Sequence, residues 1–187
     1  MTSCILVLAG LPGSGKSFAA DFFLEKGIPV VQMGKVTQEE LKKRGLSQSP
    51  QHEAKIRIML RKQYGLAIYA KRVLPIIKDF LKTHRIVIVD GVRSKFETDF
   101  FKTHLPHVVI LYLEADEQIR YKRLKERKSR SHSYTEARER DSYEWSQLGL
   151  ETIKLNADFV IKNVFDKARF RSNLNDIYRI VQTWMEQ

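Results

Sequence analysis

The sequence predicts an α/β domain of three layers, in which a parallel sheet of about five strands is covered by helices on both faces. Short apolar runs alternate with segments of helical composition, which is the rhythm of parallel strands joined by crossover helices. No repeat or low-complexity stretch interrupts this alternation. With 187 residues, 43% of them hydrophobic, the chain can bury one substantial core, so we expect residues 1–187 to form a single domain.

Five short segments carry the strand signal. The run Ile-Val-Ile-Val-Asp at residues 86–90 is typical of a strand that is buried on both faces, because it is continuously apolar and rich in β-branched residues. The predicted strands are, in chain order, residues 5–9, 27–31, 86–90, 108–113 and 159–161.

Helices are expected between these strands. The first runs to about Lys26. Residues 36–84 contain no convincing strand pattern and indicate consecutive helices, with Pro50 near a helix start and breaks at Gly45 and Gly65.

The later helices have clearer boundary signals. Residues 94–97, Ser-Lys-Phe-Glu, form a capping box that starts a helix. Asp116 is the expected cap of the next helix, which ends at a polar break at 129–133. A further helix passes through Glu144, and the last begins at about Asp166.

Composition narrows the class of protein. The single cysteine, Cys4, excludes a disulfide framework and fits a reducing compartment, so we expect a cytoplasmic protein. No run of 18 apolar residues is present, and the apolar N-terminal segment is too short for a membrane span. No membrane partner is therefore expected.

A glycine-rich motif, G-x-x-x-x-G-K-S, follows directly after the first predicted strand. Its glycines let successive backbone N–H groups point inward around an anion, and the following helix adds its positive N-terminal end. Lys16 would reach the β- and γ-phosphates of a triphosphate, and Ser17 would offer its hydroxyl to Mg²⁺. The alternative is a tight strand-to-helix turn with an incidental lysine. The predicted nucleotide-binding residues here are Gly10, Leu11, Pro12, Gly13, Ser14, Gly15, Lys16, Ser17 and Phe18.

A second polar motif, Asp90-Gly91-Val92-Arg93, ends the third predicted strand. Ligands of open parallel sheets bind beyond the carboxyl ends of the strands, where the glycine-rich loop also lies. Asp90 could orient Mg²⁺ through its water shell, and Arg93 could reach a second anion across the cleft. The alternatives are a turn cap for Asp90 and a surface ion pair for Arg93.

The net charge of +11 favours an anionic partner, and much of it lies in one segment. Residues 120–130 hold seven basic side chains against the single acid Glu126. Such a cluster can be a nucleic-acid patch, a phosphate clamp or a solvated helix face.

Several of these motifs together resemble the nucleoside monophosphate kinases. More closely, the whole chain is similar to an archaeal group of adenylate-kinase-related P-loop proteins that are also described as dephospho-CoA-kinase-like. The similarity rests on an ordered set of short motifs: G-x-P-G-S-G-K-S, Met33-Gly34, Leu60-Arg61, D-G-V-R-S, R-L-K-E-R, E-R-D and the late Ala157-Asp158-Phe159-Val160-Ile161.

The resemblance implies roles for individual arginines. It implies that Arg123 packs on the adenine ring, and that Arg127 and Arg140 contact the transferring phosphates. Arg93 matches an arginine on the phosphate of the acceptor. Residues 34–84 then form a helical acceptor segment, and 128–140 a short lid.

The chain departs from adenylate kinases after the second predicted strand. Where those enzymes carry G-D-x-x-R, this sequence has Gly34, Lys35 and Gln38, so the acid and the arginine that help hold AMP are absent. Arg57 and Arg61 lie one helical turn apart and could replace the lost anchor. An ordinary helix-surface role is the alternative for Arg57.

Together these features predict an ATP-binding, kinase-like enzyme that uses Mg²⁺ and transfers a phosphoryl group to a small, nucleotide-like metabolite. The expected catalytic residues are Lys16, Asp90, Arg127 and Arg140, with Ser17 and Asp90 at the metal. The expected acceptor residues are Gly34, Arg57, Arg61, Asp90, Gly91 and Arg93. No oligomeric state is indicated.

A different class of function is also open. Lys35, Gln38 and the basic excess would suit a nucleotide-binding sensor or a nucleic-acid-associated module with weak or no kinase activity. A third option, kinase action on a nucleic-acid 5′ end, would join both features.

Overall fold

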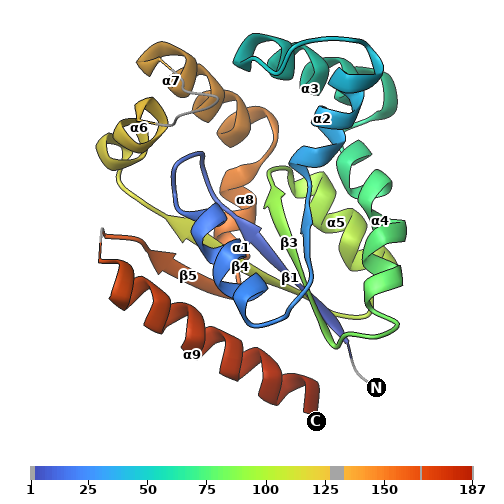
Figure 1. The fold of residues 1–187 in the computed structure, drawn as a ribbon, viewed down its shortest axis with the longest axis vertical. Coiled ribbons are helices and arrows are strands. Elements are labelled where there is room, and N and C mark those ends of the chain that lie inside the picture. Colours follow the sequence, from blue (N-terminus) through green and yellow to red (C-terminus); the bar gives the residue numbers. More distant parts are fainter. Residues whose placement is uncertain (1–2, 127–132, 165, 187) are drawn as a thin grey trace.

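The structure is a computed structural model that describes residues 3–126, 133–164 and 166–186. Within these residues, five parallel strands form one sheet (Figure 1). Their order across the sheet is β2-β3-β1-β4-β5, so β1 is central. The strands are β1 (Cys4–Ala9), β2 (Val30–Gln32), β3 (Ile86–Val92), β4 (Val108–Glu114) and β5 (Phe159–Lys162).

The central strand β1 divides two cores. It pairs in parallel with β3 on one side and β4 on the other, and all six of its residues are fully buried. Because successive side chains of a strand point to opposite faces, Ile5 and Val7 enter one apolar cluster, whereas Leu6 and Leu8 enter the other. This confirms the predicted three-layer α/β fold.

Helices cover both faces of the sheet. On one face, α1 (Lys16–Glu25) and α9 (Lys167–Glu186) pack their apolar sides against the strands. On the other face lie α4 (Ile68–Phe80), α5 (Lys95–His104) and α8 (Leu150–Leu155). Figure 1 shows α9 running along the outside of α1 and β5.

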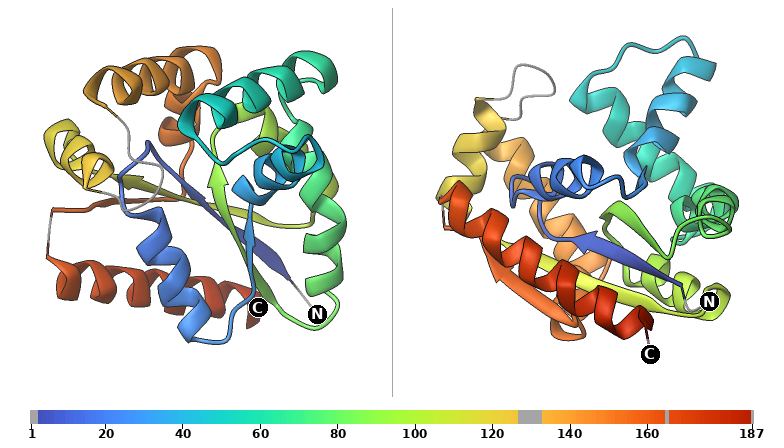
Figure 2. Two further views of the ribbon diagram at one scale, coloured as in Figure 1. Left: turned by 45° about the horizontal axis from the view of Figure 1, so that its top comes forward. Right: turned by 60° about the horizontal axis from the view of Figure 1, so that its bottom comes forward.

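Two helical groups stand above the carboxyl edge of the sheet. One consists of α2 (Gly34–Lys43) and α3 (Pro50–Tyr64); the other consists of α6 (Glu117–Lys125), α7 (Tyr134–Ser142) and the π-helical segment η1 (Tyr143–Gln147). The loop between β1 and α1 lies between the two groups (Figures 1 and 2). The fold therefore brings both groups to the glycine-rich motif.

Several boundaries agree with the sequence. Pro50 is the first residue of α3, and Gly45 and Gly65 follow helix ends with positive φ. The capping box of α5 is present: Ser94 Oγ accepts the Phe96 N–H at 3.2 Å, and Glu97 accepts the Ser94 N–H at 3.1 Å.

The second strand is shorter than the predicted 27–31. Gly27 has φ of 75°, and its N–H donates to the Leu24 carbonyl at 2.9 Å. The Ile28 N–H also donates back, to Phe23 O at 3.1 Å. These residues therefore complete the end of α1, a termination that depends on glycine, and pairing with β3 begins only at the Pro29 carbonyl.

Asp116 also differs from its prediction. It occupies the N-cap position of α6, but its side chain accepts no capping hydrogen bond. Its carboxylate lies 3.6 Å from Lys162 Nζ, so it pairs with the end of β5. Among the described residues no helix is long and apolar enough to cross a membrane.

The two capping boxes found in the described part of the chain allow a matched stability test. Ser94 is fully buried, whereas Ser133, which caps α7 in the same way, is exposed. Ser94→Ala should lower the free energy of unfolding by about 1–2 kcal/mol, because the first turn of α5 loses a capping acceptor in a place that water cannot enter. Ser133→Ala should have the smaller effect, since water can replace its hydroxyl. Urea denaturation of both variants measures the difference, and equal losses would contradict this account.

Candidate functional site

A cleft of about 280 Å³ opens at the carboxyl edge of the sheet. Its lining comes from the β1–α1 loop, the ends of β2 and β3, and helices α1 to α7. Seven lining residues are cationic, namely Lys16, Lys35, Arg57, Arg61, Arg93, Arg123 and Arg140. Three are acidic, namely Glu53, Asp90 and Glu97. The cleft is therefore suited to anionic ligands.

The glycines of the β1–α1 loop are required by close packing. Gly10, Gly13 and Gly15 have φ of 134°, 83° and 110°. A side chain at Gly10 would collide with the Leu113 carbonyl, and one at Gly15 with Asn163. At Gly13 an added Cβ would lie 2.7 Å from a backbone oxygen of α6. Only glycine fits these three positions.

Three carbonyls of the loop are bound by side chains from elsewhere. Arg120 donates to Pro12 O at 3.2 Å, Arg123 donates to Gly13 O at 3.0 Å, and Asn163 donates to Ser14 O at 2.9 Å. In a planar trans peptide the N–H points opposite to the carbonyl, so the N–H groups of Gly13 and Gly15 turn toward the cleft that both residues line. This is the arrangement of an anion-binding nest.

Lys16 begins α1 and is 7% exposed. Its Nζ donates to the carbonyl oxygens of Gly10 at 2.6 Å and Leu11 at 2.9 Å. Burial, and then Arg93, lower the pKa of Lys16 to about 7, against the opposite effect of Asp90. The ammonium group is therefore held within the loop in a poorly solvated place.

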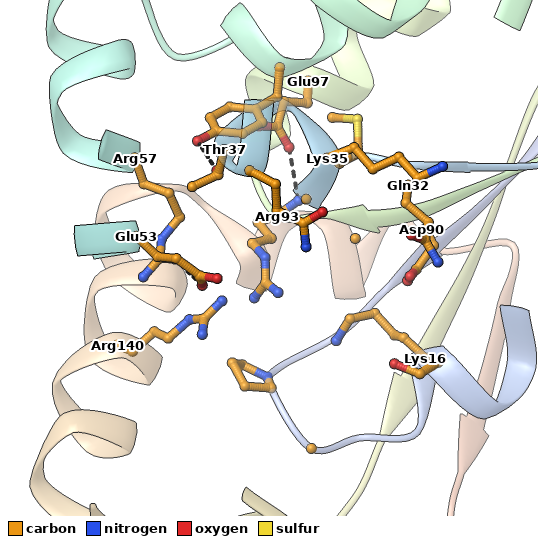
Figure 3. A pocket seen from close by; sticks show the side chains of 18 of the residues that line it. Lys16, Gln32, Lys35, Thr37, Glu53, Arg57, Asp90, Arg93, Glu97 and Arg140 are labelled. Atoms are coloured by element: carbon orange, nitrogen blue, oxygen red, sulfur yellow. Dashed lines mark hydrogen bonds and ion pairs between the residues drawn. The ribbon is translucent and has the colours of Figure 1, made fainter. Parts of the chain in front are cut away.

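Asp90 lies on β3, facing the Lys16 side of the cleft (Figure 3). Within the described residues its Oδ1 is buried and has no hydrogen-bond partner. Burial raises the pKa of Asp90, although Lys16 and Arg93 act in the opposite direction. Ser17 is exposed and lines the same cleft.

This donor set fits Mg²⁺. The described residues contain no group of three or more His, Cys, Asp or Glu side chains that could hold a metal. An ion beside Asp90 and Ser17 would take its other ligands from phosphate and water oxygens, as Mg²⁺ prefers. The orphaned Oδ1 of Asp90 can accept hydrogen bonds from such waters.

Arg93 and Arg140 converge on one buried acid, Glu144. Both Glu144 carboxylate oxygens accept from Arg93 Nη1 at 2.7 Å, and Oε1 also accepts from Arg140 Nε at 2.9 Å. Burial alone would raise the pKa of Glu144, but the two arginines outweigh it and hold this pKa well below its usual range.

The arginines of α3 form part of the cleft wall that lies opposite the β1–α1 loop. Arg61 is buried, lies 4.9 Å from the Tyr69 ring and donates to Glu97 at 3.4 Å. Arg57 donates to Glu53 at 3.4 Å, and burial, with Arg140 next, lowers its pKa to about 10. Neither arginine occupies an open helix surface.

Other predicted site residues are also brought together. Gly34, Lys35 and Gln38 from the start of α2 line the cleft, as does Gly91. Leu11 and Phe18 point elsewhere: Leu11 packs on the core, and Phe18 lies with its ring 5.4 Å from that of Phe170.

Some predicted site residues are not among those that line the cleft. Gly10 and Ser14 are buried within the loop, on the side away from the cleft lining. Arg127 and the first part of the predicted lid, 128–132, lie outside the described residues. Arg120 is 4% exposed, so it belongs to the interior and not to a solvated basic face.

Sequence reasoning missed four residues that hold the site: Arg120, Asn163, Glu97 and Glu144. Most of their partners are distant in the chain, and no local pattern reports such a pairing. One exception is Arg140, which lies four residues before Glu144, a helical spacing that could have indicated the pair. Glu97 had a partial signal, since it was predicted as part of a capping box. Its Oε2 accepts the N–H of Arg93 at 2.9 Å while Oε1 accepts from Arg61, so the cap also supports the cleft.

Solved structures with similar folds include several kinases. A shikimate kinase from Bacteroides thetaiotaomicron superposes with a TM-score of 0.61 at 12% identity, covering 96% of this chain and 98% of that one. A dephospho-CoA kinase from Campylobacter jejuni gives 0.59 at 16% identity, covering 100% and 98%. At these identities the likeness establishes a P-loop kinase-like fold, while the finer resemblance to adenylate kinases stays a prediction.

Sequence relatives define the family. The family described as AAA domain matches residues 6–144. A UPF0200 protein from Thermococcus onnurineus is 32% identical over 179 residues, which cover 92% of this chain and 95% of the relative. The chain is thus a member of the UPF0200 family and contains an AAA domain of the P-loop class.

Proposed function

We propose that this protein transfers the terminal phosphoryl group of ATP to a small anionic metabolite. The observation that carries the proposal is a single cleft in which the phosphate-binding loop faces a second, arginine-rich wall built by α2 and α3. A nucleotide-binding site alone would need no such wall. The kinase names of two fold neighbours add support.

The donor side is assigned to the loop. Lys16 would exchange its loop carbonyls for the β- and γ-phosphate oxygens of ATP, and the N–H groups of Gly13 and Gly15 would bind the same chain of phosphates. Mg²⁺, when bound, neutralises charge that develops on the phosphates. Ser17 would contact the ion directly, and Asp90 would orient its waters.

The acceptor side is assigned to the opposite wall. Arg57 and Arg93 would bind an anionic group of the acceptor, which we expect to be nucleotide-like, and Arg140 would face the transferred group. Because Arg93 is hydrogen-bonded to the same carboxylate as Arg140, it would also reach the transferred group. Phosphoryl transfer has a loose transition state, so its rate depends on positioning and on charge stabilisation more than on a covalent catalyst. Cations on both sides of the transferred group meet that need.

Two further arginines complete the proposal. Arg123 approaches the loop from α6, and its Nη1 donates to Gly13 O. Following the family resemblance, we assign its guanidinium plane to packing on the purine ring while this hydrogen bond is kept. Arg127 is proposed to contact the transferred phosphoryl group on the strength of the family resemblance alone.

A second candidate is nucleotide binding without transfer, in a nucleic-acid-associated role. The net charge of +11 favours it. Its binding to an oligonucleotide should weaken steeply with salt, because neutralised phosphates release counterions.

A screen for the acceptor separates these candidates. Purified protein with Mg-ATP should release ADP faster when the right acceptor is added, among nucleoside monophosphates, nucleosides, dephospho-CoA and short oligonucleotides. Lys16→Ala should abolish this release, since the cation at the β/γ-phosphates is lost. Thermal shift reports ligand binding independently of turnover. A folded Lys16→Ala variant with undiminished ATP affinity and turnover would refute the loop assignment.

The lowered pKa of Lys16 predicts proton uptake on ATP binding. In the free protein the Lys16 pKa is about 7. A bound triphosphate favours the ammonium form and raises this pKa, so at pH 8 binding should take up close to one proton, and at pH 6 almost none. Calorimetry with Mg-ATP in two buffers of different ionisation enthalpy measures the uptake. Identical heats in both buffers at pH 8 would count against it.

The altered acceptor wall predicts weak activity toward AMP. Lys35 and Gln38 line the cleft where adenylate kinases have an acid and an arginine. Lys35→Asp combined with Gln38→Arg should raise AMP-dependent ADP formation with little change in ATP affinity, because only acceptor positioning is changed. Initial rates and ATP affinity should be compared with the unmodified protein. Robust AMP kinase activity in that protein would show the prediction to be wrong.

A further inference from the structure

Glu144 is buried to an unusual degree for an acid. It lies in η1, the π-helical segment that continues α7, and is only 2% exposed. Glutamate is almost never buried in this way unless it is paired, because a desolvated carboxylate is costly. Its partners therefore indicate its role.

The partners of Glu144 come from two separate parts of the fold. Arg93 follows the end of β3, at the floor of the cleft, and Arg140 is four residues before Glu144 on α7. One carboxylate accepts hydrogen bonds from both guanidinium groups at 2.7 and 2.9 Å. Glu144 thus joins the helix above the cleft to the strand beneath it.

The negative charge of Glu144 offsets the repulsion between the two arginines. Burial, followed by the charge of Arg93, lowers the pKa of Arg140, which shows that the two cations repel each other in a poorly solvated place. Glu144 acts in the opposite direction on both arginines. Without a carboxylate here the guanidinium groups would move apart or toward water.

Both arginines also face the nucleotide loop. They line the same cleft as Pro12, Gly13 and Lys16. Figure 3 shows the guanidinium groups of Arg93 and Arg140 directed toward the same region, with Lys16 across from them. An anion that extends beyond the loop would therefore meet both groups.

We propose that Glu144 is a positioning residue that holds Arg93 and Arg140 together as one binding pair for the terminal phosphoryl group of a bound triphosphate. The identity of that anion rests on the proposed function. Glu144 itself lies behind the arginines and acts through them. A purely architectural role, in which Glu144 only joins α7 to β3, is the competing explanation.

The two explanations differ in how ADP and ATP respond to Glu144→Gln. The variant keeps the size of the side chain but removes its charge. If Glu144 positions the pair, ATP affinity in the presence of Mg²⁺ should fall about tenfold or more, because the terminal phosphoryl group would lose at least one charge-assisted hydrogen bond from a displaced guanidinium group. ADP affinity should change less than about twofold, because ADP lacks the terminal phosphoryl group and is held by the loop.

Isothermal titration with ADP and with a non-hydrolysable ATP analogue measures both affinities. Glu139→Gln is the matched control, because Glu139 is exposed on α7, and it should leave both affinities unchanged. Parallel losses for the two nucleotides, or an unchanged preference for the triphosphate in a folded Glu144→Gln variant, would overturn the proposal.

A variant that fails to fold does not end the test. Glu144→Asp keeps the charge, but its shorter side chain cannot reach both arginines in their present positions, so the triphosphate preference should again fall while ADP affinity holds. The same two contrary outcomes decide against the proposal. Because neither titration needs an acceptor or turnover, failure to find kinase activity would leave this result standing on its own.

Discussion

Close packing around the β1–α1 loop is the constraint on which the rest of the cleft depends. The end of β4, the backbone of α6 and the side chain of Asn163 each approach the loop so closely that a methyl group at Gly10, Gly13 or Gly15 would collide with them. Hydrogen bonds from Arg120, Arg123 and Asn163 also turn three of the loop carbonyls away from the cleft. The N–H groups of Gly13 and Gly15 therefore turn toward it. The contacts around the loop also fix α6, and through the Arg120–Asp141 ion pair of 2.6 Å they fix α7, which carries Arg140.

Charge pairing is the second organising feature of the cleft. Four of its arginines have a glutamate partner: Arg57 with Glu53, Arg61 with Glu97, and both Arg93 and Arg140 with Glu144. The contacts on the α3 wall are 3.4 Å long, whereas those to Glu144 are 2.7 and 2.9 Å. Shorter charge-assisted hydrogen bonds are stronger. The arginine pair on Glu144 is therefore set firmly in advance, and the α3 wall can adjust more easily to a ligand.

The sequence predicted what depends on neighbours along the chain. Apolar runs gave the five strands, a capping box gave the start of α5, and the glycine motif gave the loop. It misplaced the start of β2, because the helix termination at Gly27 competes with strand formation and only the fold decides between them. It did not predict the contact of Glu144 with Arg93 or that of Asn163 with Ser14, since these partners lie far apart in the chain and a lone Glu or Asn carries no trace of them. The spacing of Arg140 and Glu144 by four residues was a local signal for their ion pair.

The hydrogen bond from Asn163 to Ser14 has a consequence for where the domain can be shortened. Residues 6–144 match the AAA domain, yet Asn163 and Phe170, which lie against Gly15, come after that segment. The glycine-rich loop thus obtains part of its support from α9 and from the residue that follows β5. A fragment that stops at residue 144 would lack this support, so we expect its glycine-rich loop to lose the geometry described above even though the whole segment matched by the AAA domain is present.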